Sequence, residues 1–331
     1  MERLYHLTKA EQLTPAIVSE LLAHAERFCQ SLKVGARQFD TLKGVTLCSL
    51  FYEESTRTRF SFERAALLLG ANVIGTENAA QFSSAAKGES LEHTVKVISG
   101  ATQGHLRYAD IIVLRHPENG AADRAANVSG VSIINAGTGS EEHPTQALLD
   151  AYTFEKLLGR LEHFTISFVG DLMFSRVVNS EAVLLSQYPG VRMFFVAPEG
   201  LEMRPWLKSY LSQKGVDFRE ASDIREVVQK TDICYVVRVQ KNRIKDKELL
   251  SAYQRNRDNF AVTEEVYRMS EQKGTFFCHP MPVDEEEQEI RPEVENLPRV
   301  KMFEQAGYGV PVRMAILAKV WQSQKSRFEP V

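Results

Sequence analysis

Residues 55–59, with the sequence STRTR, bring three hydroxyl groups and two guanidinium groups together where an apolar run gives way to a predicted helix. Ser55 is a good N-cap residue, and the first turn of a helix presents N–H groups at the positive end of its dipole. The hydroxyls of Thr56 and Thr58 and the guanidinium group of Arg57 would complete a site for a phosphate or similar oxyanion. An ordinary capped helix with exposed arginines is the alternative for this segment by itself. No G-x-x-x-x-G-K-[ST] or G-x-G-x-x-G motif is present, so neither a P-loop nor a dinucleotide fingerprint competes.

His143 and Gln146, in the segment HPTQ, indicate a site for a carbonyl group. The dipole at a helix start favours the neutral imidazole, which can donate one hydrogen bond to a carbonyl oxygen. Gln146 lies about one turn further along and points to the same side. Taken singly, His143 could be a capping or packing residue, and Arg115, at the end of another apolar run, could form a surface ion pair.

Arg176, Arg238 and Gln240 together could hold a dicarboxylate, because each guanidinium fork matches one carboxylate. Full exposure to solvent is the alternative, although the apolar residues that precede each of them argue against it. Glu53, just before the oxyanion site, could pair with Arg176 or with Arg243 and act as a structural latch between two domains.

These residues must be positioned by secondary structure, and the chain alternates short apolar runs with amphipathic segments, as βαβ units do. We expect strands at 45–52, 109–116, 131–136, 164–170, 191–197, 232–238 and 275–279, and a further short strand at 300–304. We expect helices at 15–33, 55–69, 90–101, 143–157, 176–187, 203–213, 221–230 and 309–325.

This pattern predicts an α/β fold with two doubly wound parallel-sheet domains, joined by interdomain helices, with the active site in the cleft between them. A new strand follows the helix at 143–157 without a Pro/Ser-rich linker, so we place a boundary near residue 150. The expected domains are 1–150 and 151–305, with a C-terminal helix at 306–331 that packs back on the first domain.

The polar clusters described above obey one rule of position. Parallel sheets bind ligands at the carboxyl ends of their strands, and each cluster follows a predicted strand. Those that do so are Ser55–Arg59, Arg115, His143–Gln146, Arg176, Arg238 with Gln240, and the segment HPMP at 279–282. Surface decoration does not explain this coincidence.

Composition narrows the class of protein. The 331 residues are 44% hydrophobic and 25% charged, with a net charge of −3, so neither nucleic acid nor an anionic membrane is an expected partner. The N-terminus lacks the features of a signal peptide, and no apolar run is long enough to span a bilayer. The four cysteines include no C-x-x-C pair, so we expect buried thiols, a cytoplasmic location, and no metal or cofactor. The acidic run DEEEQE at 284–289 is expected to be a solvated loop.

Longer segments of the chain closely resemble catalytic chains of the aspartate carbamoyltransferase family of transcarbamylases. The segments, in the family's order from about residue 5 to 325, are FYEESTRTRFSFE, SSAAKGES, VLRHPENGAA, EEHPTQALLD, VGDLMFSRVVNS, VVRVQKNRI, HPMPVDEE and MFEQAGYGVPVRMAIL. STRTR and HPTQ are typical of transcarbamylases in general. The RVQ and HPMP segments favour the aspartate branch over the ornithine branch, where a cysteine-containing HCLP-like segment is expected.

The resemblance implies carbamoyl transfer from carbamoyl phosphate to L-aspartate, a step of pyrimidine biosynthesis. It places Ser55, Thr56, Arg57 and Thr58 around the phosphate; Arg115, His143 and Thr58 at the carbonyl oxygen; Gln146 at the carbamoyl NH2; and Arg176, Arg238, Gln240 and the Met281 backbone at the aspartate. It also implies a homotrimer in which Ser83 and Lys87 enter the active site of a neighbouring subunit, where Lys87 serves both substrates. Regulatory chains are a possible further partner.

One departure from the family pattern concerns the segment after His279. The family usually reads H-P-L-P-R before its next acidic residues, whereas this chain has HPMPVDEE and lacks the arginine. Two other functions stay open on the residues: transfer to another amine such as ornithine, and a catalytically silent subunit that binds carbamoyl phosphate.

Overall fold

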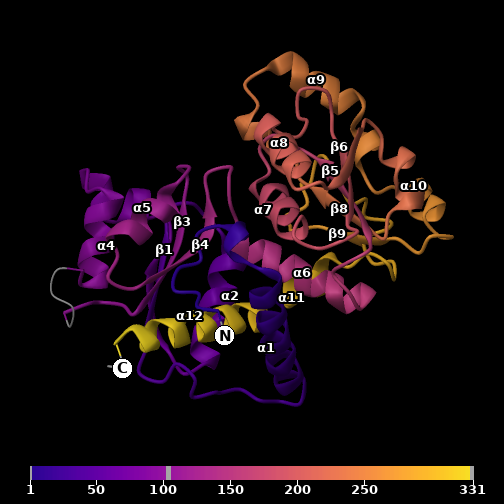
Figure 1. The fold of residues 1–331 in the computed structure, drawn as a ribbon. Helices are drawn as coiled ribbons and strands as arrows, with labels where there is room; N and C mark the ends of the chain where they lie inside the picture. Colours follow the sequence, from indigo (N-terminus) through magenta and orange to yellow (C-terminus); the bar gives the residue numbers. More distant parts are fainter. Residues whose placement is uncertain (1, 102–105, 329–331) are drawn as a thin grey trace. The chain divides into compact units, whose positions relative to one another are not determined.

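The structure is a computed structural model that describes residues 2–101 and 106–328. The chain forms two compact units, one made of the residues up to Tyr152 together with those from Tyr308 onward, the other of Thr153–Gly307 (Figure 1). Each unit contains one parallel sheet covered by helices, which confirms the predicted α/β class. Helix α6 (Pro144–Leu158) begins in the first unit and ends in the second.

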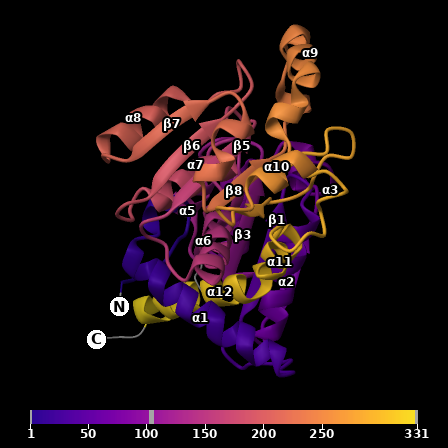
Figure 2. The same cartoon turned by 90° about the vertical axis from the view of Figure 1, so that its right-hand side faces the viewer.

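The first unit has a four-stranded parallel sheet. Its strands follow the order β2 (Asn72–Thr76), β1 (Thr46–Phe51), β3 (Ile111–His116) and β4 (Ser132–Thr138). The helical elements of this unit are η1 (Ala10–Gln12), α1 (Pro15–Lys33), α2 (Thr56–Leu68), α3 (Ala79–Phe82), η2 (Ser84–Lys87), α4 (Leu91–Ser99), α5 (Ala121–Val128) and α12 (Gly309–Phe328). Helices α1, α2 and α12 pack together, and α4 packs with α5 (Figures 1 and 2).

Strands β1, β3 and β4 are buried on both faces of the sheet, which explains why they read as continuous apolar runs. Cys48, Leu50 and Ile112 join the apolar cluster that Leu91 and Val95 of α4 complete. Burying a side chain of this size contributes roughly 1.5–3 kcal/mol. The sheet is therefore a rigid base for the loops at its carboxyl edge.

The second unit has a five-stranded parallel sheet. Its strands follow the order β7 (Asp217–Ala221), β6 (Arg192–Val196), β5 (Thr165–Gly170), β8 (Ile233–Val237) and β9 (Phe276–Cys278). The helical elements of this unit are α7 (Arg176–Leu185), α8 (Pro205–Gln213), η3 (Ile224–Glu226), η4 (Val228–Lys230), η5 (Lys241–Arg243), α9 (Lys247–Arg255), η6 (Arg257–Phe260), α10 (Glu264–Met269) and α11 (Met302–Gly307). In Figure 1, α7 and α8 lie on one side of this sheet and α10 on the other.

Side chains alternate between the two faces of this second sheet, as the pleat requires. Val169 and Val236 face the cluster that includes Tyr253 and Val266. Phe168 lies on the other face, where its ring stacks on Phe195 at 5.3 Å between centroids and meets Tyr235 edge-on at 5.9 Å. Both faces are therefore packed, and strand β5 is fixed at the centre.

Two predicted elements are wrong. The segment 300–304 forms only an isolated bridge, between Val300 and Phe277, and helix α11 begins at Met302. The segment 221–230 is not one helix, because β7 continues to Ala221 and two short 3-10 turns follow. Asp223 starts the first turn by accepting a hydrogen bond from the N–H of Arg225 at 2.8 Å.

Strands β2 and β7 were not predicted, and both are edge strands. Their residues are half-buried or exposed, with the burial pattern of an edge and not of a core strand. An edge strand needs little apolar surface, so the sequences NVIGT and DFREA carry no strong strand signal. Over the described part of the chain, no helix is both long and apolar enough to cross a bilayer.

Gly170, the last residue of β5, fixes how closely strand β8 can approach. Its φ is +121°, which L side chains rarely adopt, and a Cβ atom there would lie 2.2 Å from the carbonyl oxygen of Val237. Val237 is the residue before Arg238. Glycine is therefore required at this point both for its conformation and for the space it leaves.

We predict that Gly170→Ala destabilises the second unit by about 2 kcal/mol or more, which lowers the melting temperature by roughly 4–8 °C. Gly215→Ala is the matched control, because Gly215 also has a positive φ of +69° but an added Cβ atom there would meet nothing within 4 Å. Thermal unfolding followed by circular dichroism measures both. Equal losses in the two variants would show that the contact with Val237 does not matter.

Candidate active site

The predicted oxyanion site lies at the start of α2, directly after strand β1. Ser55 occupies the N-cap position as predicted, but its side chain makes no capping hydrogen bond. Thr58 is buried, at 6% exposure, whereas Thr56 and Arg57 are exposed. Because Ser55 does not cap the helix, the N–H groups of the first turn are left to another hydrogen-bond acceptor. An anion is the acceptor that the helix dipole favours there.

Arg59, the second arginine of STRTR, forms ion pairs within the first unit. Arg59 donates to Glu63 at 2.8 Å and to Glu77 at 2.7 Å, and its side chain is 21% exposed. These two carboxylates, Glu63 first, raise the pKa of Arg59. Arg59 therefore ties α2 to the segment after β2, and Arg57 is the arginine of the pair that faces solvent.

Arg115 is the second-to-last residue of strand β3, which lies next to β1 in the sheet. Its Nη1 donates to the carbonyl oxygen of Ala136 at 3.2 Å, and its Nε lies 3.7 Å from Glu53 Oε2. Both of these neighbours of the Arg115 guanidinium group, Ala136 and Glu53, belong to the first unit. The predicted latch of Glu53 with Arg243 would join the two units, and it stays a prediction.

His143 lies at the start of α6, after strand β4, and is 4% exposed. Its carbonyl oxygen accepts hydrogen bonds from the N–H groups of Gln146 at 3.0 Å and Ala147 at 3.2 Å, as that of an N-cap residue does. The hydroxyl of Thr145 lies 3.4 Å from its Nδ1. The imidazole is therefore held at a helix start, where the predicted role requires it.

Two buried charged residues were not predicted from the sequence: Asp150, which binds Gln146, and Arg313, which the charge of Asp150 affects. Gln146 Nε2 donates to Asp150 Oδ1 at 3.0 Å, and Asp150 is fully buried. Arg313 of α12 is also buried, and its guanidinium lies 5.1 Å from the ring centroid of Phe62. Burial lowers the pKa of Arg313 to about 10, and the charge of Asp150 opposes that shift. With its nitrogen bound to Asp150, Gln146 presents its Oε1 as an acceptor for an NH2 group.

Ser83 and Lys87 lie on a short segment between β2 and α4. Ser83 is half-buried, accepts a hydrogen bond from the N–H of Ala85 at 3.1 Å and donates to the carbonyl oxygen of Ala79 at 2.5 Å. Lys87 is exposed at the end of η2, and Phe82 is 77% exposed. Their place in the site of a neighbouring subunit stays a prediction.

In the second unit, Asp171 organises the carboxyl end of strand β5. This fully buried residue accepts hydrogen bonds from the N–H of Phe174 at 2.9 Å and of Gln240 at 3.1 Å. Gln240 Nε2 also donates to the carbonyl oxygen of Phe174 at 2.7 Å. Burial raises the pKa of Asp171, and these backbone N–H groups counter the shift. The loops after β5 and β8 are thus joined.

The predicted acceptor residues follow three adjacent strands of the second sheet. Arg176 begins α7 after β5, Arg238 and Gln240 follow β8, and Met281 follows β9. Arg176 and Arg238 are both half-buried. Met281 has a φ of +58°, and its N–H donates to His279 Nδ1 at 2.8 Å. A methionine in this conformation costs of order 1–3 kcal/mol, so its backbone is held by its surroundings.

The acidic run 284–289 is only partly solvated, in contrast to the prediction: Glu285 and Glu286 are exposed, but two other residues are buried. Glu287 and Glu289 are 2% and 3% exposed, and the N–H of Asp284 donates to Glu289 Oε2 at 2.9 Å. Lys241 contacts this run through its ammonium group. The run of acidic residues by itself predicted a solvent-exposed loop. The sequence does not show that a lysine 43 residues earlier reaches these carboxylates.

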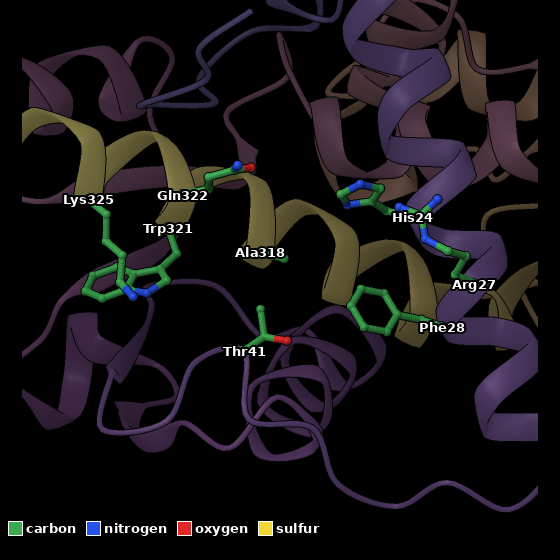
Figure 3. A pocket seen from close by; sticks show the side chains of 8 residues that line it. All are labelled: His24, Arg27, Phe28, Thr41, Ala318, Trp321, Gln322 and Lys325. Atoms are coloured by element: carbon green, nitrogen blue, oxygen red, sulfur yellow. The ribbon is translucent and has the colours of Figure 1, made fainter. Parts of the chain in front are cut away.

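A separate pocket of about 400 Å³ lies between α1 and α12 of the first unit (Figure 3). His24, Arg27 and Phe28 line it from α1, and Trp321 and Lys325 line it from α12. It contains none of the predicted site residues, so pocket size does not identify the site. Within residues 2–101 and 106–328, no group of three or more His, Cys, Asp or Glu side chains could hold a metal ion.

Comparison with protein families places both halves of the chain. The model described as "Aspartate/ornithine carbamoyltransferase, carbamoyl-P binding domain" matches residues 5–156, and that of the Asp/Orn binding domain matches residues 162–320. The aspartate carbamoyltransferase catalytic subunit of Methanocaldococcus jannaschii is 41% identical over 95% of this chain and 97% of its own length. Aspartate carbamoyltransferase 3, chloroplastic, of Pisum sativum is 42% identical over 95% of this chain and 77% of its own length.

Solved structures give the same result. The M. jannaschii catalytic subunit superposes with a TM-score of 0.85 at 40% identity and covers 96% of this chain and 98% of its own. Aspartate transcarbamoylase of Trypanosoma cruzi, in complex with carbamoyl phosphate and aspartate, superposes with a TM-score of 0.86 at 32% identity and covers 96% of both chains. The chain therefore belongs to the aspartate/ornithine carbamoyltransferase family.

Proposed function

We propose that the protein transfers the carbamoyl group of carbamoyl phosphate to the amino group of L-aspartate, giving N-carbamoyl-L-aspartate and phosphate. The observation that carries this proposal is the residue set at the carboxyl ends of the two sheets. One sheet carries an uncapped helix start with Arg57, and the other carries two half-buried arginines for a diacid. The names of the relatives agree, as do the T. cruzi complexes with carbamoyl phosphate and aspartate.

Each step of the reaction has residues suited to it. The neutral amine of aspartate attacks the carbonyl carbon, and negative charge grows on the carbonyl oxygen, where Arg115, His143 and Thr58 act as hydrogen-bond donors. The bond from that carbon to the phosphate oxygen then breaks, and Arg57 with Lys87 stabilises the leaving phosphate. The proton of the amine passes to the departing phosphate, so no side chain has to act as the general base.

The acceptor is held by residues of the second unit. Arg176 binds the α-carboxylate, and Arg238 with Gln240 binds the side-chain carboxylate. Binding both substrates in one site turns a bimolecular step into an effectively unimolecular one, which supplies much of the acceleration. The orientation of Gln146 by Asp150 fits this scheme, because its Oε1 would accept from the carbamoyl NH2.

A homotrimer with shared active sites is part of the proposal. The exposed positions of Lys87 and Phe82, on a segment anchored at one end by Glu77, support donation of Ser83 and Lys87 to a neighbouring subunit. Regulatory chains are a possible further partner. The four buried, free cysteines support a reducing compartment, and we propose the cytoplasm, while the plant relatives are named chloroplastic.

An isotope assay tests the proposed function. Purified protein is incubated with radiolabelled carbamoyl phosphate and either L-aspartate or L-ornithine, and the carbamoylated products are separated. We expect labelled N-carbamoyl-L-aspartate only. Product from ornithine and none from aspartate would assign a different acceptor, and no product from any amine would indicate a silent subunit.

We predict that Arg57→Ala lowers kcat by about 10²–10³ while the fold is retained, because the leaving phosphate loses its guanidinium partner. Arg64→Ala is the matched control, since Arg64 is exposed on the same helix two turns further on. Steady-state rates and circular dichroism spectra measure both. A rate for Arg57→Ala close to that of Arg64→Ala would contradict the phosphate site.

Sharing of sites has its own test. Lys87→Ala and Arg57→Ala chains are each expected to be inactive, but a reassembled equal mixture should regain about a quarter of the wild-type activity, because one site in every hybrid trimer is intact. Activity and hybrid formation are followed together. Hybrids that form without recovering activity would place both residues in the same subunit's site.

A further inference from the structure

Lys241 lies where the two acceptor-binding loops of the second unit meet. It follows Gln240 directly, at the start of η5, after strand β8. Its Nζ lies 2.7 Å from Glu286 Oε2, 3.3 Å from Glu287 Oε1 and 3.4 Å from Asp284 Oδ1. These carboxylates follow Met281, after strand β9, which pairs with β8. One ammonium group thus connects the carboxyl ends of two adjacent strands.

The carboxylate side of this contact is a well-ordered turn. Asp284 Oδ1 accepts from the N–H groups of Glu286 at 3.0 Å and Glu287 at 3.2 Å, and the carbonyl oxygen of Asp284 accepts from the N–H of Gln288 at 2.9 Å. Glu287 is 2% exposed, so its carboxyl group is largely removed from water. The ammonium group of Lys241 lies beside it.

The contact pairs one ammonium group with three carboxylates. Burial by itself would lower the pKa of Lys241, but hydrogen bonds and charge from Glu286, Asp284 and Glu287 raise it overall. Lysine therefore stays charged at neutral pH. On the other side of the same loop, Gln240 is bonded to Asp171 and Phe174, so the loop is fixed from two directions.

The departure of this chain from the family pattern occurs in the same place. Val283 follows Pro282 where the family usually has an arginine, and Val283 packs against the apolar core of the second unit. The turn 282–289 therefore carries no arginine of its own. Arg257 and Arg291 donate to the carbonyl oxygens of Glu286 and Glu287 at 3.1 Å, but the cation that reaches the carboxylates from β8 is Lys241.

We propose that Lys241 is a positioning residue for the acceptor: it sets the spacing between Arg238 and Gln240 after β8 and the Met281 backbone after β9. The inference rests on the proposed function, because it assigns those residues to L-aspartate. Lys241 acts through its neighbours and does not touch the substrate. Loss of the Lys241 side chain should weaken the binding of aspartate and leave the binding of carbamoyl phosphate unchanged.

The test is a comparison of steady-state kinetics. We expect Lys241→Met to raise the KM for aspartate about tenfold or more, since small misplacements of a binding group are costly. The KM for carbamoyl phosphate should change by less than about twofold. Lys241→Arg should restore the KM for aspartate to within about threefold of wild type, because it keeps the positive charge.

Lys273→Met is the matched control. Lys273 Nζ lies 2.6 Å from Asp232 Oδ1, so this pair links the segments that precede β8 and β9, at the opposite ends of the same strands. Its loss should lower the melting temperature and leave both KM values near those of wild type. Glu286→Gln is the second variant, to be used if Lys241→Met does not fold. The side chain of Glu286 is 80% exposed, so its replacement should leave the fold intact. We expect it to raise the KM for aspartate about two- to threefold.

The outcomes separate the two claims. A wild-type protein that makes no carbamoyl-aspartate would overturn the proposed function and this inference with it. An active wild type in which Lys241→Met raises both KM values alike, or neither, would overturn the inference only. If Lys273→Met also raised the KM for aspartate but not that for carbamoyl phosphate, the inference would be overturned, because the effect would then follow from general destabilisation of the second unit.

Discussion

A cation that binds a substrate anion must be fixed in position and yet keep its charge accessible, and this constraint explains the ion pairs beside Arg57 and Gln240. Arg59, two residues after Arg57, is bound to Glu63 and Glu77, and this pairing fixes the helix on which Arg57 is exposed. In the second unit, Lys241 is bound to the acidic turn next to Gln240. In these two places, carboxylates pair with Arg59 and Lys241, and the paired residues hold the backbone beside Arg57 and Gln240.

The sheets provide the other part of this arrangement. Neighbouring parallel strands end at one edge, so residues far apart in sequence come to the same place without any long-range signal in the sequence. In the first unit, that edge brings together the segments after β1, β3 and β4; in the second, those after β5, β8 and β9. Gly170 and Asp171, at the end of β5, set how closely the loop carrying Arg238 can approach. Catalysis by charge stabilisation depends on such fixed positions, because donors that must reorganise lose most of their effect.

The sequence was informative where local rules decide the structure. Core strands were predicted from their apolar runs, and the strand-end positions of Arg57, His143 and Arg238 follow from those strands. Edge strands β2 and β7 were missed because they bury little. The effect of Asp150 on Arg313 could not be foreseen, since the two residues are far apart in the sequence and only the packing of α12 brings Arg313 into the first unit. The acidic run was misjudged for the same reason: its partner Lys241 lies in a distant segment.

We propose that residues of both units bind the same pair of substrates. The most direct measurement is a crystal structure with a bisubstrate analogue that carries a phosphonate and two carboxylates. We expect the phosphonate oxygens to lie within hydrogen-bond distance of Arg57 and of the N–H groups at the start of α2. We expect the two carboxylates of the analogue to bind Arg176 and Arg238. An analogue held by the first unit only, with Arg238 contacting no ligand atom, would contradict it.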